Sequence, residues 1–153
     1  MGAEPHIYVD ADACPVKAEA AKVAARHGLP ITFVANSWMQ LPRGARLRMH
    51  VVSGAFDAAD AWIVGELARG DIVITADSPL ASAALKKGAR VLGPGGKPFT
   101  DDNIGNALAT RELMSDLRAY GVGGGPPPFE QRDRSRFLQA LELAVRAAVR
   151  AAD

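Results

Sequence analysis

A single cysteine, Cys14, is present among the 153 residues, so the chain has no internal disulfide and no zinc site built from several cysteines. An excess of one charge is also missing, because 18 basic and 17 acidic residues leave a formal net charge of +1. No apolar run approaches the roughly 20 residues that span a bilayer, and the first ten residues lack the basic-then-apolar pattern of a signal peptide. We therefore expect a cytoplasmic protein that contacts no membrane and holds any anionic partner locally.

The overall composition of the chain is that of an ordinary folded domain. Hydrophobic residues make up 48% of the chain and charged residues 23%, both typical of globular proteins. One domain of this length buries roughly two-thirds of the surface that its unfolded chain exposes. We predict a single domain over residues 1–153, with an α/β body (1–120), a Gly/Pro-rich linker (121–130) and a C-terminal helix (131–153). The pattern specifies no oligomeric state.

Short apolar runs rich in β-branched residues alternate with alanine-rich stretches of helical period, as in a parallel sheet covered by helices. We predict an α/β fold, a three-layer sandwich around a mostly parallel five-stranded sheet. The expected strands are His6–Asp10, Ile31–Ala35, Arg48–Val52, Asp71–Thr75 and Arg90–Leu92. The expected helices run from Pro15 to Gly28, from Asp57 to Arg69, from Pro79 to Lys87 and from Asp101 to Tyr120, before the C-terminal helix.

Aspartates gather where these strands end and the next helices begin. Asp10 closes the first strand and Asp12 follows it, while Asp77 comes two residues after the fourth strand. Asp57 and Asp60 are three residues apart in a first helical turn, so they share one face. Ligands of open α/β sheets bind beyond the carboxyl ends of the strands. We therefore expect these carboxylates to converge at one edge of the sheet.

Such a group of carboxylates, with no lysine or arginine in the same motifs, is strongly self-repelling at low effective dielectric. A hard cation relieves the repulsion. Oxygen ligands with few neutral partners suit weakly bound Mg²⁺ or Mn²⁺, which can orient a phosphate and activate a water nucleophile. Capping of helix starts is the alternative role of Asp57 and Asp77. It does not apply directly to Asp10, which ends a strand.

Basic residues supply candidate contacts to a substrate phosphate. Lys17 lies one turn into the first helix, and Arg43, Arg46 and Arg48 cluster in "LPRGARLRMH" with no acid nearby. Phosphate contacts of this kind fix the register of a nucleic acid without reading its sequence. A solvated loop is the alternative explanation of the arginine cluster. Trp38, just beyond the second strand, offers either a stacking face for a base or ordinary packing.

Five segments of the chain form a recognisable series: "VDADACPVK", "FDAADAWIV", "GDIVITADSPLA", "KKGARVLGPGGKPFTDDNI" and "GGPPPFEQRDRSRFLQAL". In this order they resemble the YaiI/YqxD family of uncharacterised bacterial proteins, which is assigned to the PIN-domain-like fold. The resemblance covers about residues 6–148. It implies a PIN-like fold and, through kinship to PIN nucleases, a metal-dependent activity on nucleic acid.

The kinship also implies roles for the aspartates. Asp10, Asp60 and Asp77 match the metal-holding acids of PIN sites, and Asp12 or Asp57 is the candidate for the fourth acid. PIN sites often carry glutamate at the position of Asp60, whose shorter side chain would shift the metal. The leading interpretation is a Mg²⁺- or Mn²⁺-dependent phosphodiester hydrolase acting on single-stranded RNA, in which Asp12 or Asp57 orients the attacking water.

Two other functions fit part of the pattern. "DADA" resembles the D-x-D motif of haloacid-dehalogenase-like phosphatases, with Thr75, a lysine at 86 or 87 and the pair Asp101–Asp102 as later motifs. That family has a turn and flap where a regular helix is expected here from Pro15, and Asp101–Asp102 follow "GGKPFT" instead of ending a strand. The second is a non-catalytic RNA- or nucleotide-binding module with a structural ion, which would show the same pattern of acidic residues.

Overall fold

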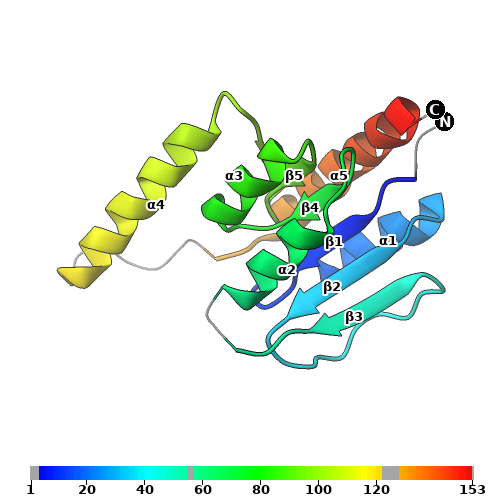
Figure 1. Ribbon diagram of the computed structural model, residues 1–153, viewed down its shortest axis with the longest axis horizontal. Helices are drawn as coiled ribbons and strands as arrows, with labels where there is room; N and C mark the ends of the chain where they lie inside the picture. The colour runs from blue at the N-terminus through cyan, green and yellow to red at the C-terminus, as the bar shows by residue number, and fades with distance from the viewer. Residues whose placement is uncertain (1–3, 55–56, 122–127, 153) are drawn as a thin grey trace.

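The computed structural model describes residues 4–54, 57–121 and 128–152. In these residues the chain forms one six-stranded sheet in the order β3-β2-β1-β4-β5-β6 (Figure 1). The strands are β1 (Ile7–Asp10), β2 (Ile31–Ala35), β3 (Leu47–Val51), β4 (Ile72–Ile74), β5 (Arg90–Leu92) and β6 (Pro98–Phe99). The helices are α1 (Lys17–His27), α2 (Ala58–Glu66), α3 (Ser78–Lys86), α4 (Ile104–Ala119) and α5 (Gln131–Ala152).

The predicted α/β class, the five strands and the C-terminal helix are confirmed, and four of the five strand pairings are parallel. The sheet has one more strand than predicted, because β6 adds to β5 in the antiparallel direction. Its two residues, Pro98 and Phe99, are too few for a strand pattern to show. Helix α1 begins at Lys17 and not at Pro15, since Pro15 and Val16 form a turn.

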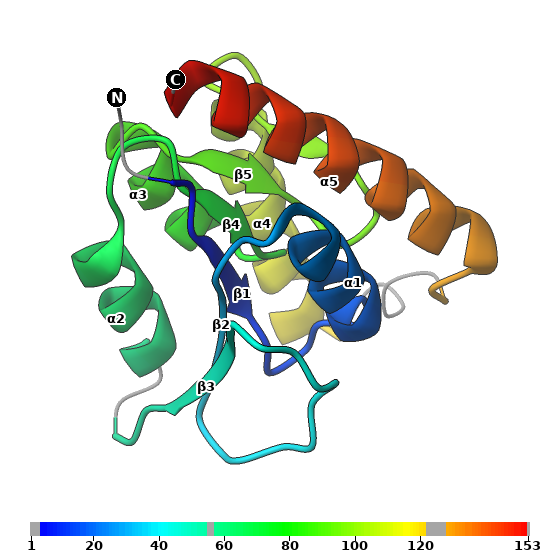
Figure 2. The ribbon, with the colours of Figure 1, turned by 90° about the vertical axis from the view of Figure 1, so that its right-hand side faces the viewer.

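Alternate strand residues pack into two hydrophobic clusters on opposite faces of the sheet. Ile7, with its neighbours in β2 and β4, packs against α1 and α5, whereas Tyr8 belongs to the cluster under α2 and α3. Figure 2 shows α1 and α5 side by side on one face, with α2 on the other. Because both faces are covered, the central strands β1, β2 and β4 are apolar at most positions, with Asp10 and Thr32 as exceptions.

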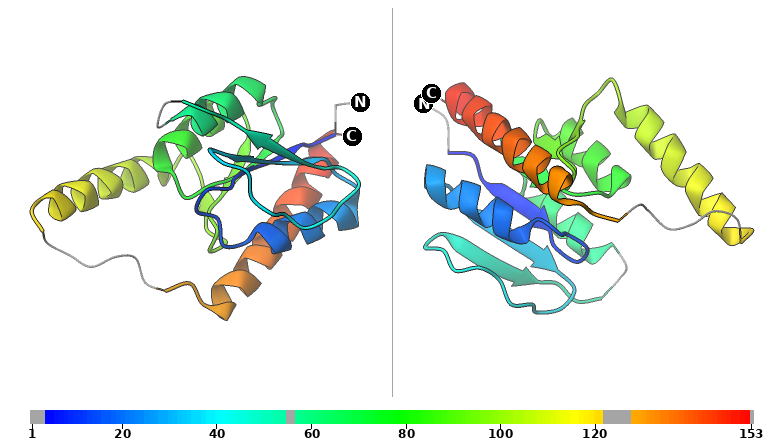
Figure 3. Two further views of the ribbon diagram at one scale, coloured as in Figure 1. Left: turned by 90° about the horizontal axis from the view of Figure 1, so that it is seen from below. Right: turned by 180° about the vertical axis from the view of Figure 1, so that it is seen from behind.

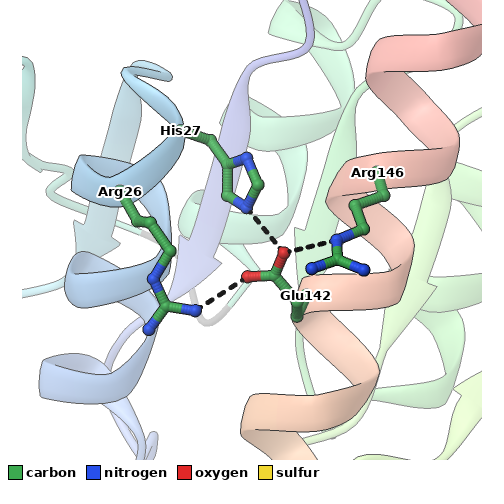
Figure 4. Close-up of polar contacts among 4 residues, drawn as sticks. All are labelled: Arg26, His27, Glu142 and Arg146. Atoms are coloured by element: carbon green, nitrogen blue, oxygen red, sulfur yellow. Dashed lines mark hydrogen bonds and ion pairs between the residues drawn. The ribbon is translucent and has the colours of Figure 1, made fainter.

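Helix α5 packs on its own chain through four buried residues at helical spacing: Phe137, Leu141, Val145 and Ala148. Beside this stripe, Glu142 holds α5 to α1. Its carboxylate accepts hydrogen bonds from Arg26 Nη1 at 3.0 Å and Arg146 Nε at 2.8 Å, and lies 2.9 Å from His27 Nε2 (Figure 4). The hydrogen bond with His27 is the main cause that lowers the pKa of Glu142.

The turn between β5 and β6 rests directly on α5. Gly96 has a φ of +90°, and a Cβ atom there would lie 2.7 Å from the carbonyl of Arg136 and 2.9 Å from the nitrogen of Phe137. Only glycine combines this backbone conformation with this close approach. The turn that carries Pro94 and Lys97 is therefore fixed against the C-terminal helix.

Helix α4 is the least embedded element. It packs against α3 and extends away from the sheet in both views of Figure 3, and none of its residues is buried. Of the predicted linker 121–130, residues 122–127 lie outside the described part. No helix in the described ranges is long and apolar enough to cross a membrane.

Candidate functional site

The strand order reverses at β1 and β4. From β1 the chain builds β2 and β3 to one side, and β4, β5 and β6 continue on the other. The crevice beyond the carboxyl ends of two such strands is the usual ligand site of an open α/β sheet. A cavity of about 290 Å³ lies there, and Asp10, Asp12, Cys14, Thr75 and Asp77 are among its lining residues. We call it the acidic cavity.

Thr75 joins the two strand ends. Its hydroxyl donates a hydrogen bond of 2.8 Å to Asp10 Oδ2 and accepts one of 3.0 Å from the backbone N–H of Asp77. Thr75 is 1% exposed and Asp10 is half-buried. Burial raises the pKa of Asp10, with further contributions from the charges of Asp77 and Asp12, against the lowering effect of Thr75. The Asp10 carboxylate is thus held in an environment that disfavours its charge.

Asp77 has both of its oxygens engaged. As the N-cap of α3 it accepts a hydrogen bond of 2.9 Å from the N–H of Leu80 at Oδ2, so the capping role is confirmed for one oxygen. The other, Oδ1, lies 3.3 Å from Nη2 of Arg111 in α4. The carboxylate is therefore both a structural cap and one member of an ion pair at the rim of the cavity.

Asp60, in the first turn of α2, faces the same place from the neighbouring helix. Burial and the negative charges of Asp77 and Asp10 raise the pKa of Asp60 to about 7, and a hydrogen bond to Asp77 favours its protonated form. Asp60 therefore lies near Asp10 and Asp77, although it is not among the residues that line the acidic cavity.

The other two aspartates lie at the exposed rim. Both oxygens of Asp12 are 3.1 Å from the backbone N–H of Asn36, which ties the β1–α1 loop to the end of β2. Asp57 precedes α2, and its side chain caps no N–H among the described residues. Its charge still contributes to the raised pKa of Asp60. Both carboxylates are exposed to solvent.

Cys14 lines the acidic cavity, and Lys17 lies beside it. The Lys17 ammonium donates a hydrogen bond of 2.5 Å to the carbonyl oxygen of Cys14, which places this charge beside a residue that lines the cavity. Cys14 itself is 4% exposed, and burial raises the pKa of its thiol. A buried thiol with a raised pKa is a poor nucleophile.

Two of the three arginines predicted to contact phosphate lie away from this edge. Arg48 lies near the start of β3, opposite Thr32, and Arg46 precedes that strand and forms an ion pair with Glu4. Parallel β3 begins at the amino edge of the sheet, so both side chains are a strand length from the aspartates. Arg43 is exposed in the loop that leads to β3.

Comparison with known proteins places the chain in a family. A family model described as "Uncharacterized BCR, YaiI/YqxD family" matches residues 8–147. The chain belongs to the YaiI/YqxD family. A UPF0178 protein of Brucella ovis is 57% identical over 141 residues, 91% of this chain and 88% of the relative. One of Rhodopseudomonas palustris is 54% identical over 141 residues, 92% and 91% of the two chains. No solved structure gives a significant match.

Sequence reasoning on this YaiI/YqxD protein missed Arg111. The residue lies in a helical stretch, "TRELMSDLRA", in which basic and acidic residues mix as on a solvated face. Only the packing of α4 on α3 brings its guanidinium to Asp77. The sequence motifs give Thr75 a role only in the phosphatase alternative, although its position just before Asp77 is visible in the sequence.

The carboxylate oxygens of these aspartates are ligands of the kind that a hard divalent cation prefers. The raised pKa values of Asp10 and Asp60 indicate that the negative charge here is not fully compensated. Within residues 4–54, 57–121 and 128–152, however, no three His, Cys, Asp or Glu side chains are arranged to hold one ion as they stand. An ion at Asp77 therefore competes with Arg111 for Oδ1.

Proposed function

We propose that this YaiI/YqxD protein is a divalent-metal-dependent phosphodiester hydrolase that acts on single-stranded RNA. The proposal rests on the proximity of Asp60 to Asp10 and Asp77, whose charges, together with burial, raise the pKa of Asp60 to about 7. Carboxyl groups with strongly perturbed pKa values in a cleft are candidates for a functional site. The kinship of the family to PIN nucleases supports the choice of reaction.

The residues take distinct roles in this proposal. Asp10, Asp60 and Asp77 hold Mg²⁺ or Mn²⁺, and Asp12 or Asp57, exposed at the rim, accepts the proton of the attacking water. When bound, the ion supplies charge stabilisation at the phosphate and a lowered pKa of water. Lys17, beside the cavity, faces the phosphate. Arg43, Arg46 and Arg48 would contact only more distant parts of a bound RNA.

The test is a cleavage assay with purified protein and Mn²⁺ against single-stranded RNA, single-stranded DNA and a generic phosphomonoester. We expect cleavage of RNA that EDTA abolishes and that Asp60→Asn lowers by about 100-fold or more. Asp116→Asn, the same chemical change on the exposed face of α4, serves as the matched control. Loss of cleavage in both variants, or cleavage without metal, contradicts the proposal.

One observation favours the second candidate, an RNA-binding module without turnover. The ion pair between Arg111 and Asp77 compensates one carboxylate without any cation. In that case the protein binds RNA, Mn²⁺ alters the binding, and no substrate is cleaved.

The phosphatase alternative receives less support. Its later acidic motif, Asp101–Asp102, lies in the exposed turn before α4 and is absent from the residues that line the acidic cavity. Cleavage of the phosphomonoester alone would favour it.

A further inference from the structure

A second cavity, of about 510 Å³, adjoins the acidic cavity. Ala76 and Pro94 line both, so the two share one wall at the end of β4 and the start of the β5–β6 turn. The second cavity continues from this wall to α4, the helix that extends from the body in Figure 1. Its volume is in the ordinary range of small-molecule sites. We call it the basic cavity.

The charges of the two cavities are opposite. The basic cavity is lined by Lys97 and Arg111 and by no acidic residue of the described chain. Among the described residues, the acidic cavity is lined by three aspartates and by no basic residue. An anion favoured in one cavity therefore lies directly beside a cation favoured in the other. A phosphate ester paired with a divalent cation has this distribution of charge.

Arg111 marks the boundary between the cavities. Its side chain lines the basic cavity, and its Nη2 reaches Asp77 Oδ1, 3.3 Å away, at the rim of the acidic one. A guanidinium in this place can bind a phosphate bidentately.

Helix α4 supplies the rest of the wall. Asn106, Thr110 and Met114 line the cavity, and their spacing of four residues places them on one face of the helix. Across from them, Phe99 of β6 contributes an aromatic ring to the lining. The wall therefore combines amide and hydroxyl groups with apolar surface, which suits a nucleobase and its sugar. This role gives α4 a function that its lack of buried residues leaves unexplained.

We propose that the basic cavity binds the nucleotide next to the scissile phosphate of a single-stranded RNA, with the base between Phe99 and Met114 and the phosphate toward Lys97 and Arg111. The inference rests on the function proposed for the acidic cavity, and it adds where the substrate lies. It makes the β5–β6 turn and α4 the substrate-binding elements.

The test measures binding without turnover. Fluorescence anisotropy of a fluorescein-labelled RNA oligonucleotide and calorimetry with adenosine 5′-monophosphate are carried out in EDTA. Two variants change the cavity: Lys97→Ala removes a charge, and Met114→Glu places an acid in the wall. Their matched controls are Lys87→Ala, at the exposed end of α3, and Leu113→Glu, an exposed residue of α4 that does not line the cavity.

We expect Lys97→Ala to weaken binding of both probes by about fivefold and Met114→Glu by about tenfold or more, with both controls within about twofold of wild type. Circular dichroism melts check that the variants are folded. We expect them to be, because Lys97 and Met114 are both exposed. Binding that is equal in wild type and both cavity variants overturns the inference, as does a wild type that binds neither probe.

The two proposals fail in different ways. If Asp60-dependent cleavage of RNA is found but Lys97→Ala and Met114→Glu leave both binding and KM unchanged, the basic cavity is not the nucleotide site, while the hydrolase proposal stands. If no substrate is cleaved but both probes bind in a way that depends on Lys97 and Met114, the hydrolase proposal fails and the basic cavity remains a nucleotide site.

Discussion

Thr75 fixes the relative positions of Asp10 and Asp77. Its hydroxyl donates to Asp10 and accepts from the N–H of Asp77, so one small side chain fixes the ends of β1 and β4 relative to each other. A buried hydroxyl that satisfies two partners holds them in place, because leaving either unpaired carries a cost of about 1–3 kcal/mol. The separation of Asp10 and Asp77 is thus set by packing and hydrogen bonding before any ligand arrives.

Asp60 gives a pH-dependent prediction for the metal-free protein. Its pKa in the folded state, about 7, lies above the ordinary value of 3.8, so the folded state binds the proton more tightly than the unfolded chain. Between about pH 4 and pH 7 this group therefore lowers the free energy of unfolding as pH rises. Asp60→Asn removes the effect. We expect a gain of about 1–2 kcal/mol at pH 8, limited by partial solvation, and little gain near pH 4.5.

Urea unfolding at the two pH values, with EDTA present, measures this difference. Asp116→Asn is the control, because that residue is exposed on α4. A difference between wild type and Asp60→Asn that is the same at both pH values would show that the Asp60 carboxyl titrates normally in the folded protein.

At the scale of elements, local sequence patterns predicted what local forces determine. Helix α1 ends at Gly28 in the left-handed conformation, with a φ of 65°, as a glycine after a helical stretch indicates. The edge strand β6 has no such pattern, because two residues show no alternation. It exists because the turn at Gly96 brings Pro98 and Phe99 back against β5.

Helix α5 gives a prediction about packing. Leu141 is completely buried in the cluster shared with α1 and the sheet, whereas Leu143, two residues further on, is 65% exposed. Leu141→Ala leaves a cavity, so we expect the free energy of unfolding to fall by about 2–5 kcal/mol. Leu143→Ala, the control, changes it by less than about 0.5 kcal/mol. Chemical denaturation measures both, and equal effects would mean that α5 does not pack as described.

At the scale of the whole molecule, one topological rule was enough to predict part of the site. Parallel strands place their carboxyl ends at one edge, so the topology alone assigns the aspartates at strand ends to that edge. Arg46 and Arg48 lie at the other edge because they stand at the start of β3, not at its end. Arg111 depends on how α4 packs against α3, which no local pattern in that helix specifies.

A titration of Mn²⁺ against thermal unfolding tests most directly the proposal that Asp10, Asp60 and Asp77 hold a divalent cation. An ion that binds only the native state raises Tm progressively with its concentration. Asp77→Asn keeps an oxygen to cap Leu80 and removes the charge, and Asp116→Asn is the control. We predict that wild type and Asp116→Asn show the rise and that Asp77→Asn loses most of it. An equal rise in all three proteins would contradict the account.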